Sequence, residues 1–135
     1  MKLVVIPMLF IGLCMGCAST DSVNSEQLKY SQWQLEQVNG VMVPSTVEAS
    51  MGFIEALQIN GFAGCNKFFG EGVLEQNRLT VNKLGKTRKQ CSSELNTIEK
   101  QLLNTLKNGA DVSMQNQKLV MQGEQELIFK EKLPL

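Results

Sequence analysis

The sequence predicts a mainly β protein of the α+β class, with a curved antiparallel sheet or a partly open barrel packed around a single α-helix. Several short segments alternate apolar and polar residues and are separated by turn residues, which is typical of antiparallel strands. Only one stretch, near residues 93–107, has apolar residues at helical spacing. The stretch 60–70 holds three glycines, three phenylalanines and a cysteine, which indicates a strand entering a buried turn. A length of 135 residues indicates one domain.

The first 16 residues have the features of a secretory signal peptide. A short positive start, Met1-Lys2, precedes an apolar run from Leu3 to Met15. A run of about 13 residues is too short to cross a bilayer as a helix, because about 20 are needed. The sequence therefore predicts export from the cytoplasm, with residues 1–16 removed.

The end of this segment resembles the lipobox of bacterial lipoproteins. Gly16, a small residue, directly precedes Cys17 behind the apolar run. Cleavage between them would leave Cys17 as the attachment point for acyl chains such as palmitate, which anchor a protein to a membrane. Ala18 then follows, and by resemblance to enteric sorting rules this favours the outer membrane, with the domain facing the periplasm. The alternative is an ordinary signal peptide that is cut nearby.

Residues 17–28 are predicted to be the lipidated cysteine and a flexible tether, and residues 29–135 the folded domain. The tether is rich in serine, asparagine and aspartate, and Val23 is the only sizeable apolar residue between Ala18 and Gln27. Such a stretch buries too little apolar surface to order itself.

The first half of the domain is predicted to form hairpins. Residues 33–38 alternate, Asn39-Gly40 is a strong hairpin turn signal, and residues 41–43 return until Pro44 stops the strand. Residues 45–52 are expected to be a loop. Residues 55–59 are the next expected strand, and Asn60-Gly61 the next expected turn. Strands are also expected at 73–74 and 79–81, with a turn at Gln76-Asn77.

The second half is predicted to be a helix followed by a three-strand meander. Ser92 or Ser93 is expected to cap the helix start, and Gly109 to end it. The apolar stripe consists of Leu95, Ile98, Leu102 and Leu106. The strands of the meander are marked by the pairs Val112 and Met114, Leu119 and Met121, and Leu127 and Phe129. Trp33, Phe68, Leu102 and Phe129 are expected to share one core.

These residues together resemble the META domain family of heat-shock lipoproteins over about residues 30–129. The resemblance rests on Trp33-x-Leu35-x-x-Val38-Asn39-Gly40, on Gly64-Cys65-Asn66-x-Phe68-x-Gly70, on Thr87-x-x-x-Cys91, on the helix with Glu99, and on the strands with Leu119 and Phe129. It implies a curved antiparallel sheet around one helix, a place in the Gram-negative envelope, and a link to heat or envelope stress. It implies no established enzymatic activity.

Cys65 and Cys91 are expected to form a disulfide, because an even pair of cysteines in an oxidising compartment usually does so. An active thiol, a zinc site and two free buried thiols are the alternatives. The chain has no histidine, which removes the usual base for a cysteine nucleophile and the commonest metal ligand. No Cys-x-x-Cys spacing is present. We therefore expect no metal and no cofactor.

The charge balance disfavours a nucleic-acid partner, because 13 basic and 13 acidic residues leave no excess for phosphate contacts. Four cations cluster at Lys83, Lys86, Arg88 and Lys89. We expect a solvated loop there; the alternative is a patch for an anionic ligand or for lipid headgroups. Asn66 is expected to bond to backbone near a turn rather than to a ligand.

The leading expectation for function is a non-catalytic outer-membrane lipoprotein that supports the envelope under stress. Its expected partners are the membrane, through the lipid on Cys17, and an envelope protein or a small ligand that the sequence does not identify. The alternatives are a periplasmic binding module, such as a lipocalin-like ligand binder or an inhibitor, and an enzyme.

Overall fold

The computed structural model describes residue 16 and residues 21–133. The predicted signal peptide, residues 1–16, lies outside the described residues except for Gly16, and so does Cys17, the predicted lipidation site. The helices are α1 (Ser25–Leu28), α2 (Ser93–Asn108) and the short 3₁₀-helix η1 (Glu55–Leu57). The strands are β1 (Asp21–Ser22), β2 (Gln32–Val38), β3 (Val41–Met42), β4 (Ala49–Phe53), β5 (Gln58–Ala63), β6 (Lys67–Glu75), β7 (Arg78–Lys86), β8 (Ala110–Gln115), β9 (Lys118–Gln122) and β10 (Glu126–Glu131).

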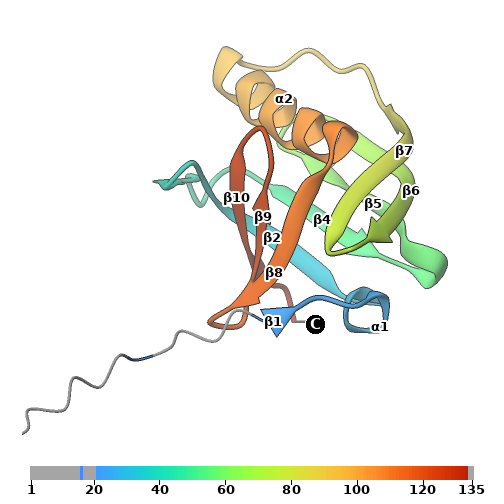
Figure 1. Cartoon of the computed structure of the whole chain (residues 1–135). Coiled ribbons are helices and arrows are strands. Elements are labelled where there is room, and N and C mark those ends of the chain that lie inside the picture. Colours follow the sequence, from blue (N-terminus) through green and yellow to red (C-terminus); the bar gives the residue numbers. More distant parts are fainter. Residues whose placement is uncertain (1–15, 17–20, 134–135) are drawn as a thin grey trace, which may run out of the picture.

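Eight of the strands form a closed antiparallel barrel (Figure 1). Going round the ring, β2 pairs with β4, and then β5, β6, β7, β8, β9 and β10 follow in order. The ring closes because β10 pairs with β2 as well as with β9. The fold is therefore mainly β with one long helix, and of the two expected sheet forms the barrel is the observed one, closed rather than partly open.

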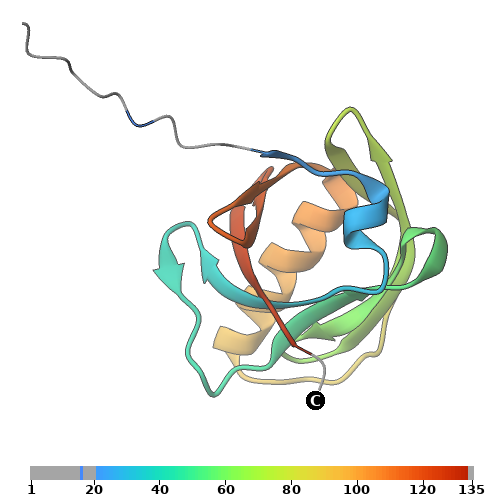
Figure 2. The same ribbon diagram turned by 90° about the horizontal axis from the view of Figure 1, so that it is seen from below.

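Helix α2 lies across one end of this barrel (Figures 1 and 2). Ser92 caps its start, since the Ser92 Oγ accepts a hydrogen bond from the Leu95 backbone N–H at 3.3 Å. Its apolar stripe is buried at Ile98, Leu102 and Leu106. Gly109 ends the helix with φ of +88°, a backbone conformation that favours glycine. The predicted helix is confirmed, and it ends one residue later than expected.

The opposite end of the barrel is covered by residues 21–28, which differ from the tether expected there. β1 pairs with β8, and α1 follows it directly. Val23 and Leu28 are buried, at 4% and 1% exposure, and both belong to the main core. The tether was predicted from the polar composition of the segment. Burial of these two apolar side chains offsets the conformational entropy lost when the segment becomes ordered.

Among the described residues, none of the helices has the length and apolar character that would span a bilayer.

Several predicted hairpins are confirmed. Asn39-Gly40 forms the turn between β2 and β3, and both residues have positive φ, as the tightest hairpin turns require. Gln76-Asn77 forms the turn between β6 and β7, also with positive φ. The meander of β8, β9 and β10 is formed by antiparallel pairing, as expected.

Three expectations in the first half of the domain are wrong. The strand expected at residues 55–59 begins only at Gln58, because residues 55–57 form the 3₁₀-helix η1. The predicted loop 45–52 contains most of β4, which pairs with both β2 and β5. Asn60-Gly61, predicted as a turn, lies inside β5. Gly61 is there for a different reason: a Cβ atom on it would lie 2.8 Å from the Phe68 ring and 2.1 Å from the Ser50 carbonyl oxygen. The turn falls instead at residues 64–66.

The barrel interior is filled by one apolar cluster. Trp33, Phe68, Leu102 and Phe129 all belong to it and are all at most 3% exposed, as predicted. The other large side chains that are fully buried are Phe53, Leu28, Met51, Ile59, Leu79, Leu106, Leu119, Met121 and Leu127. The interior is therefore a packed core, like that of other small barrels whose inward side chains fill the space.

Candidate functional site

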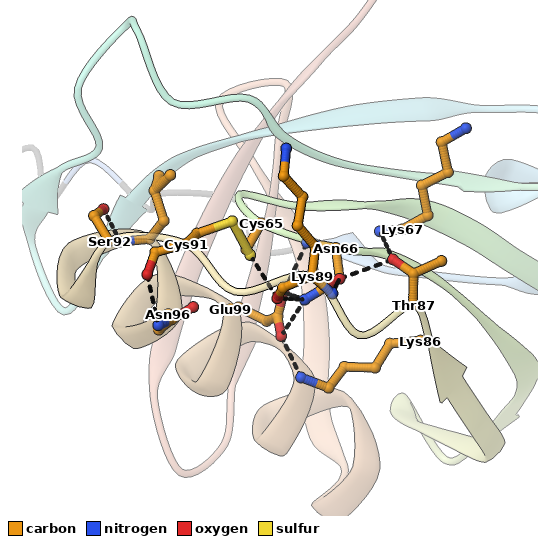
Figure 3. The surroundings of a disulfide bond; sticks show 11 residues. Cys65, Asn66, Lys67, Lys86, Thr87, Lys89, Cys91, Ser92, Asn96 and Glu99 are labelled. Carbon is orange, nitrogen blue, oxygen red and sulfur yellow. Dashed lines mark hydrogen bonds and ion pairs between the residues drawn. A yellow bond between two sulfur atoms is a disulfide. The ribbon is translucent and has the colours of Figure 1, made fainter.

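Cys65 and Cys91 form a disulfide, with their Cα atoms 5.9 Å apart (Figure 3). Cys65 lies in the turn between β5 and β6, and Cys91 lies two residues before α2 begins. The bond therefore ties the start of the helix to the barrel wall. Because both sulfurs are bonded, neither is free to act as a thiol nucleophile or as a metal ligand in this state. Within residue 16 and residues 21–133, no group of acidic and cysteine side chains is placed to hold a metal ion.

Next to the disulfide, Asn66 and Glu99 meet in a buried polar contact (Figure 3). They are 2% and 4% exposed. The backbone N–H of Asn66 donates to Glu99 Oε2 at 2.8 Å, and the Asn66 Nδ2 donates to both carboxylate oxygens at 3.1 and 3.2 Å. Glu99 lies on the inward face of α2, so this contact joins the middle of the helix to the turn that carries Cys65.

The Asn66 carboxamide also binds the connection between β7 and α2. Asn66 Oδ1 accepts from the Thr87 Oγ1 at 2.8 Å and from the Lys89 backbone N–H at 2.6 Å. Its Nδ2 also reaches the Lys89 carbonyl at 3.1 Å. Thr87 Oγ1 in turn accepts from the Lys67 N–H at 3.2 Å. Asn66 thus bonds to backbone, as expected, and it orders a connection that has no regular structure of its own.

Lys86 completes the cluster through an ion pair with the buried Glu99 carboxylate. Its side chain is 47% exposed, whereas that of Glu99 is 5% exposed. A buried carboxylate is costly unless it is paired and hydrogen-bonded, and here it has both kinds of partner. In the described part of the chain, every buried side-chain nitrogen and oxygen has a hydrogen-bond partner. We call Asn66, Lys86, Thr87 and Glu99 the polar cluster.

The residues singled out in the sequence fall into two groups. Gly64, Asn66, Thr87 and Glu99 lie at the polar cluster beside the disulfide, and Gly64 has φ of +91° there. The others lie elsewhere and serve the fold. Trp33 and Phe68 are core residues, Gly40 is in the β2–β3 turn, and Gly70 lies against β7, where a Cβ atom would meet Val81 at 2.4 Å. The cluster is therefore a joint between helix and barrel.

Two surface hollows were not foreseen from the sequence. A groove of about 590 Å³ runs between the β2–β3 hairpin and α2, where Val41 and Met42 are 70% and 59% exposed. A second hollow, of about 410 Å³, lies beside Phe69, which is 60% exposed. The exposure of Phe69 could have been predicted from the sequence. Adjacent residues in a strand face opposite sides, so only one of Phe68 and Phe69 can point into the core.

The fold and the joint define a class of small protein: a closed antiparallel barrel, filled by its own core, with a disulfide-linked helix across one end. Residues 26–133 match the META domain, and the chain belongs to this family. It is 37% identical over 123 residues to the heat shock protein HslJ of Escherichia coli strain K12, a match that covers 87% of each chain.

Two solved structures have the same fold. An NMR structure with 34% sequence identity superposes with a TM-score of 0.72 and covers 80% of this chain and 94% of its own. An NMR structure of a protein from Burkholderia xenovorans, 21% identical, superposes with a TM-score of 0.74 over 96% of this chain and all of its own. At that identity the second match shows the fold alone.

Proposed function

We propose that this protein is a non-catalytic lipoprotein of the bacterial outer membrane that supports the envelope during heat or envelope stress. The link to heat shock comes from the related HslJ, whose name describes it as a heat shock protein. The lipid anchor comes from Gly16-Cys17 behind an apolar run. The domain would face the periplasm.

The observation that carries this proposal is the disulfide between Cys65 and Cys91. Stable structural disulfides belong to oxidising compartments, of which the periplasm is one, and are rare in the cytosol. The bond therefore agrees with an exported chain. The polar cluster beside it supports a structural role, because the carboxylate of Glu99 is occupied by Asn66 and Lys86. Those contacts would have to break before Glu99 could exchange a proton with a substrate.

A binding module is the second candidate, and the groove between the β2–β3 hairpin and α2 favours it. A lipocalin-like ligand would enter the barrel, but the core side chains fill that space. A ligand of this protein would instead lie on the outer surface, where the groove exposes Val41 and Met42. An inhibitor or a small-ligand binder would use this face.

The anchor is tested by metabolic labelling with a fatty-acid probe in cells that express the full chain. We expect label on the natural protein and none on Cys17→Ser. Cys14→Leu is the matched control, because it removes the other cysteine of this segment and places there the leucine that is usual three residues before the lipidated cysteine of a lipobox. We expect it to be labelled normally. Label on Cys17→Ser equal to that on the control would rule out Cys17 as the lipid site. If only Cys17→Ser loses its label, fractionation of the labelled natural protein separates inner from outer membrane.

A further inference from the structure

Half of the protein's lysines and arginines outside its first 16 residues gather on one flank. Four lie within residues 83–89, a stretch without an acidic residue. Lys67 joins them because its carbonyl accepts a hydrogen bond from the Thr87 N–H at 3.0 Å. Lys100 joins them because it shares a hollow of about 330 Å³ with Lys86 and Lys89. The basic flank is defined as Lys67, Lys83, Lys86, Arg88, Lys89 and Lys100.

Few acidic side chains balance these charges. Glu71 pairs with Lys83 at 3.0 Å, and Glu99 pairs with Lys86. In Figure 3, Lys67 and Lys89 extend away from Glu99, whereas Lys86 turns towards it. The flank therefore has an excess of positive charge, although the whole chain has a formal net charge of zero. A local excess of this kind attracts a partner of opposite charge.

An exposed aromatic ring adjoins the basic flank. Phe69 lies two residues after Lys67 on β6, so the two side chains share the outer face of the barrel. The Phe69 ring lies over Gly85, where a Cβ atom would come within 2.6 Å of it. The hollow of about 410 Å³ beside the ring is also lined by Gln58, Asn60 and the ion pair of Lys83 with Glu71. An apolar ring face and two carboxamides are thus presented together, and the positive charge for an acidic ligand comes from the other cations of the flank.

On the function proposed above, on which this step rests, the lipid anchor would attach near the end of the molecule opposite the basic flank. Cys17 is only four residues from Asp21, so their Cα atoms are at most about 15 Å apart. β1 and the connection between β7 and α2 lie at opposite ends in both views (Figures 1 and 2). A lipid on Cys17 would therefore hold the β1 end at the membrane, with the basic flank facing away from it.

We propose that the basic flank and Phe69 form a binding surface for an acidic glycan, a polymer of sugar rings that carry carboxylate-bearing substituents. The C–H face of a sugar ring stacks on an exposed aromatic ring. Carboxamides such as those of Gln58 and Asn60 donate to and accept from hydroxyl groups. Lysine and arginine pair with carboxylates, which an uncharged glycan lacks. An anionic membrane would satisfy the charges but would have to lie on the side away from the anchor.

The test uses the full chain, expressed in cells, extracted with mild detergent and mixed with purified peptidoglycan sacculi, an insoluble acidic glycan. Chitin is the uncharged glycan, and vesicles of phosphatidylglycerol are the anionic membrane. We expect co-sedimentation with sacculi that weakens between about 50 and 300 mM salt, and little with chitin. The double variant Arg88→Ala/Lys89→Ala should bind about tenfold more weakly. Lys130→Ala/Lys132→Ala removes the same charge elsewhere and should not change binding.

The ring is tested separately with Phe69→Ala, for which we expect a loss of binding at every salt concentration. Tyr30→Ala, which removes an aromatic side chain that is 70% exposed and does not line this hollow, is its control. Equal binding by all four variants, or no binding to sacculi, would overturn the proposal. Binding to vesicles but not to sacculi would replace the glycan with a membrane. Labelling of Cys17 is measured independently, so failure here leaves the anchor intact.

Discussion

At one end of the barrel a 16-residue helix is held by a disulfide and a buried carboxylate, whereas at the other end a four-residue helix is held by two buried apolar side chains. Helix α2 joins segments far apart in the sequence, since Asn66 and Glu99 are 33 residues apart. The hydrogen bonds of α2 to the barrel need particular donors and acceptors, and changing one partner removes most of the stabilisation that the bond contributes. Burial of Val23 and Leu28 requires only apolar side chains of suitable size. The α2 end should therefore be the more rigid and the more sensitive to substitution.

The largest expected effect is removal of the disulfide. The double variant Cys65→Ala/Cys91→Ala should lower the free energy of unfolding by about 3–4 kcal/mol, from the chain entropy of the loop that the bond closes. Urea denaturation of the purified domain measures it. The natural protein under reducing conditions should lose a similar amount, while the double variant should not respond to reductant. A variant as stable as the oxidised natural protein would show that the polar cluster alone holds α2.

This difference between the ends also marks what the sequence could predict. Helix α2 was predicted to within a residue because its stripe, its serine cap and Gly109 are all local signals. The β2–β3 hairpin was predicted from Asn39-Gly40 for the same reason. The disulfide was predicted from an even pair of cysteines in a chain for which export was expected.

The errors arose where a residue serves a distant partner. Gly61 follows an asparagine, and this dipeptide is typical of a turn. Glycine is needed at this position for another reason, because the Phe68 ring leaves no room for a Cβ atom. Strand β4 consists of Ala-Ser-Met-Gly-Phe, which has little intrinsic strand preference, and its pairing with both β2 and β5 determines its structure. The polar cluster could not be assembled in advance, because nothing local shows that Asn66 and Glu99 meet.

A smaller effect is expected at the carboxylate of Glu99. In Glu99→Gln the new side chain has a single acceptor oxygen. Its carboxamide NH₂ is a donor and would face the donors of Asn66 and Lys86, so hydrogen bonds would be lost there. We expect a loss of about 2 kcal/mol in the free energy of unfolding. Glu94→Gln, at an exposed carboxylate in the first turn of the same helix, is the control and should cost a few tenths of a kcal/mol. Equal losses in the two variants would mean that the buried contact contributes nothing beyond the helix dipole.

The smallest effect is expected at the α1 end. The ion pair of this helix, between Glu26 and Lys29, is exposed to solvent; it raises the pKa of Lys29, chiefly through the hydrogen bond and then through the charge of Glu26. A surface pair of this kind contributes little. The start of the helix is held by a capping box, in which Asn24 accepts from the Gln27 N–H at 3.0 Å and Gln27 Oε1 accepts from the Asn24 N–H at 2.9 Å.

Asn24→Ala removes half of this box and should cost about 1 kcal/mol. Amide hydrogen exchange is the sharper measurement, because Leu28 is the one buried residue within α1, and an element with few buried contacts is expected to open locally. We expect faster exchange at the Lys29 and Ser31 amides, which bond to carbonyls within residues 25–28, and unchanged exchange in α2. Ser25→Ala, at an exposed residue one position later, should leave both unchanged. If Asn24→Ala instead speeds exchange in α2, the two ends open together, and α1 belongs to the same cooperative unit as the disulfide-linked helix.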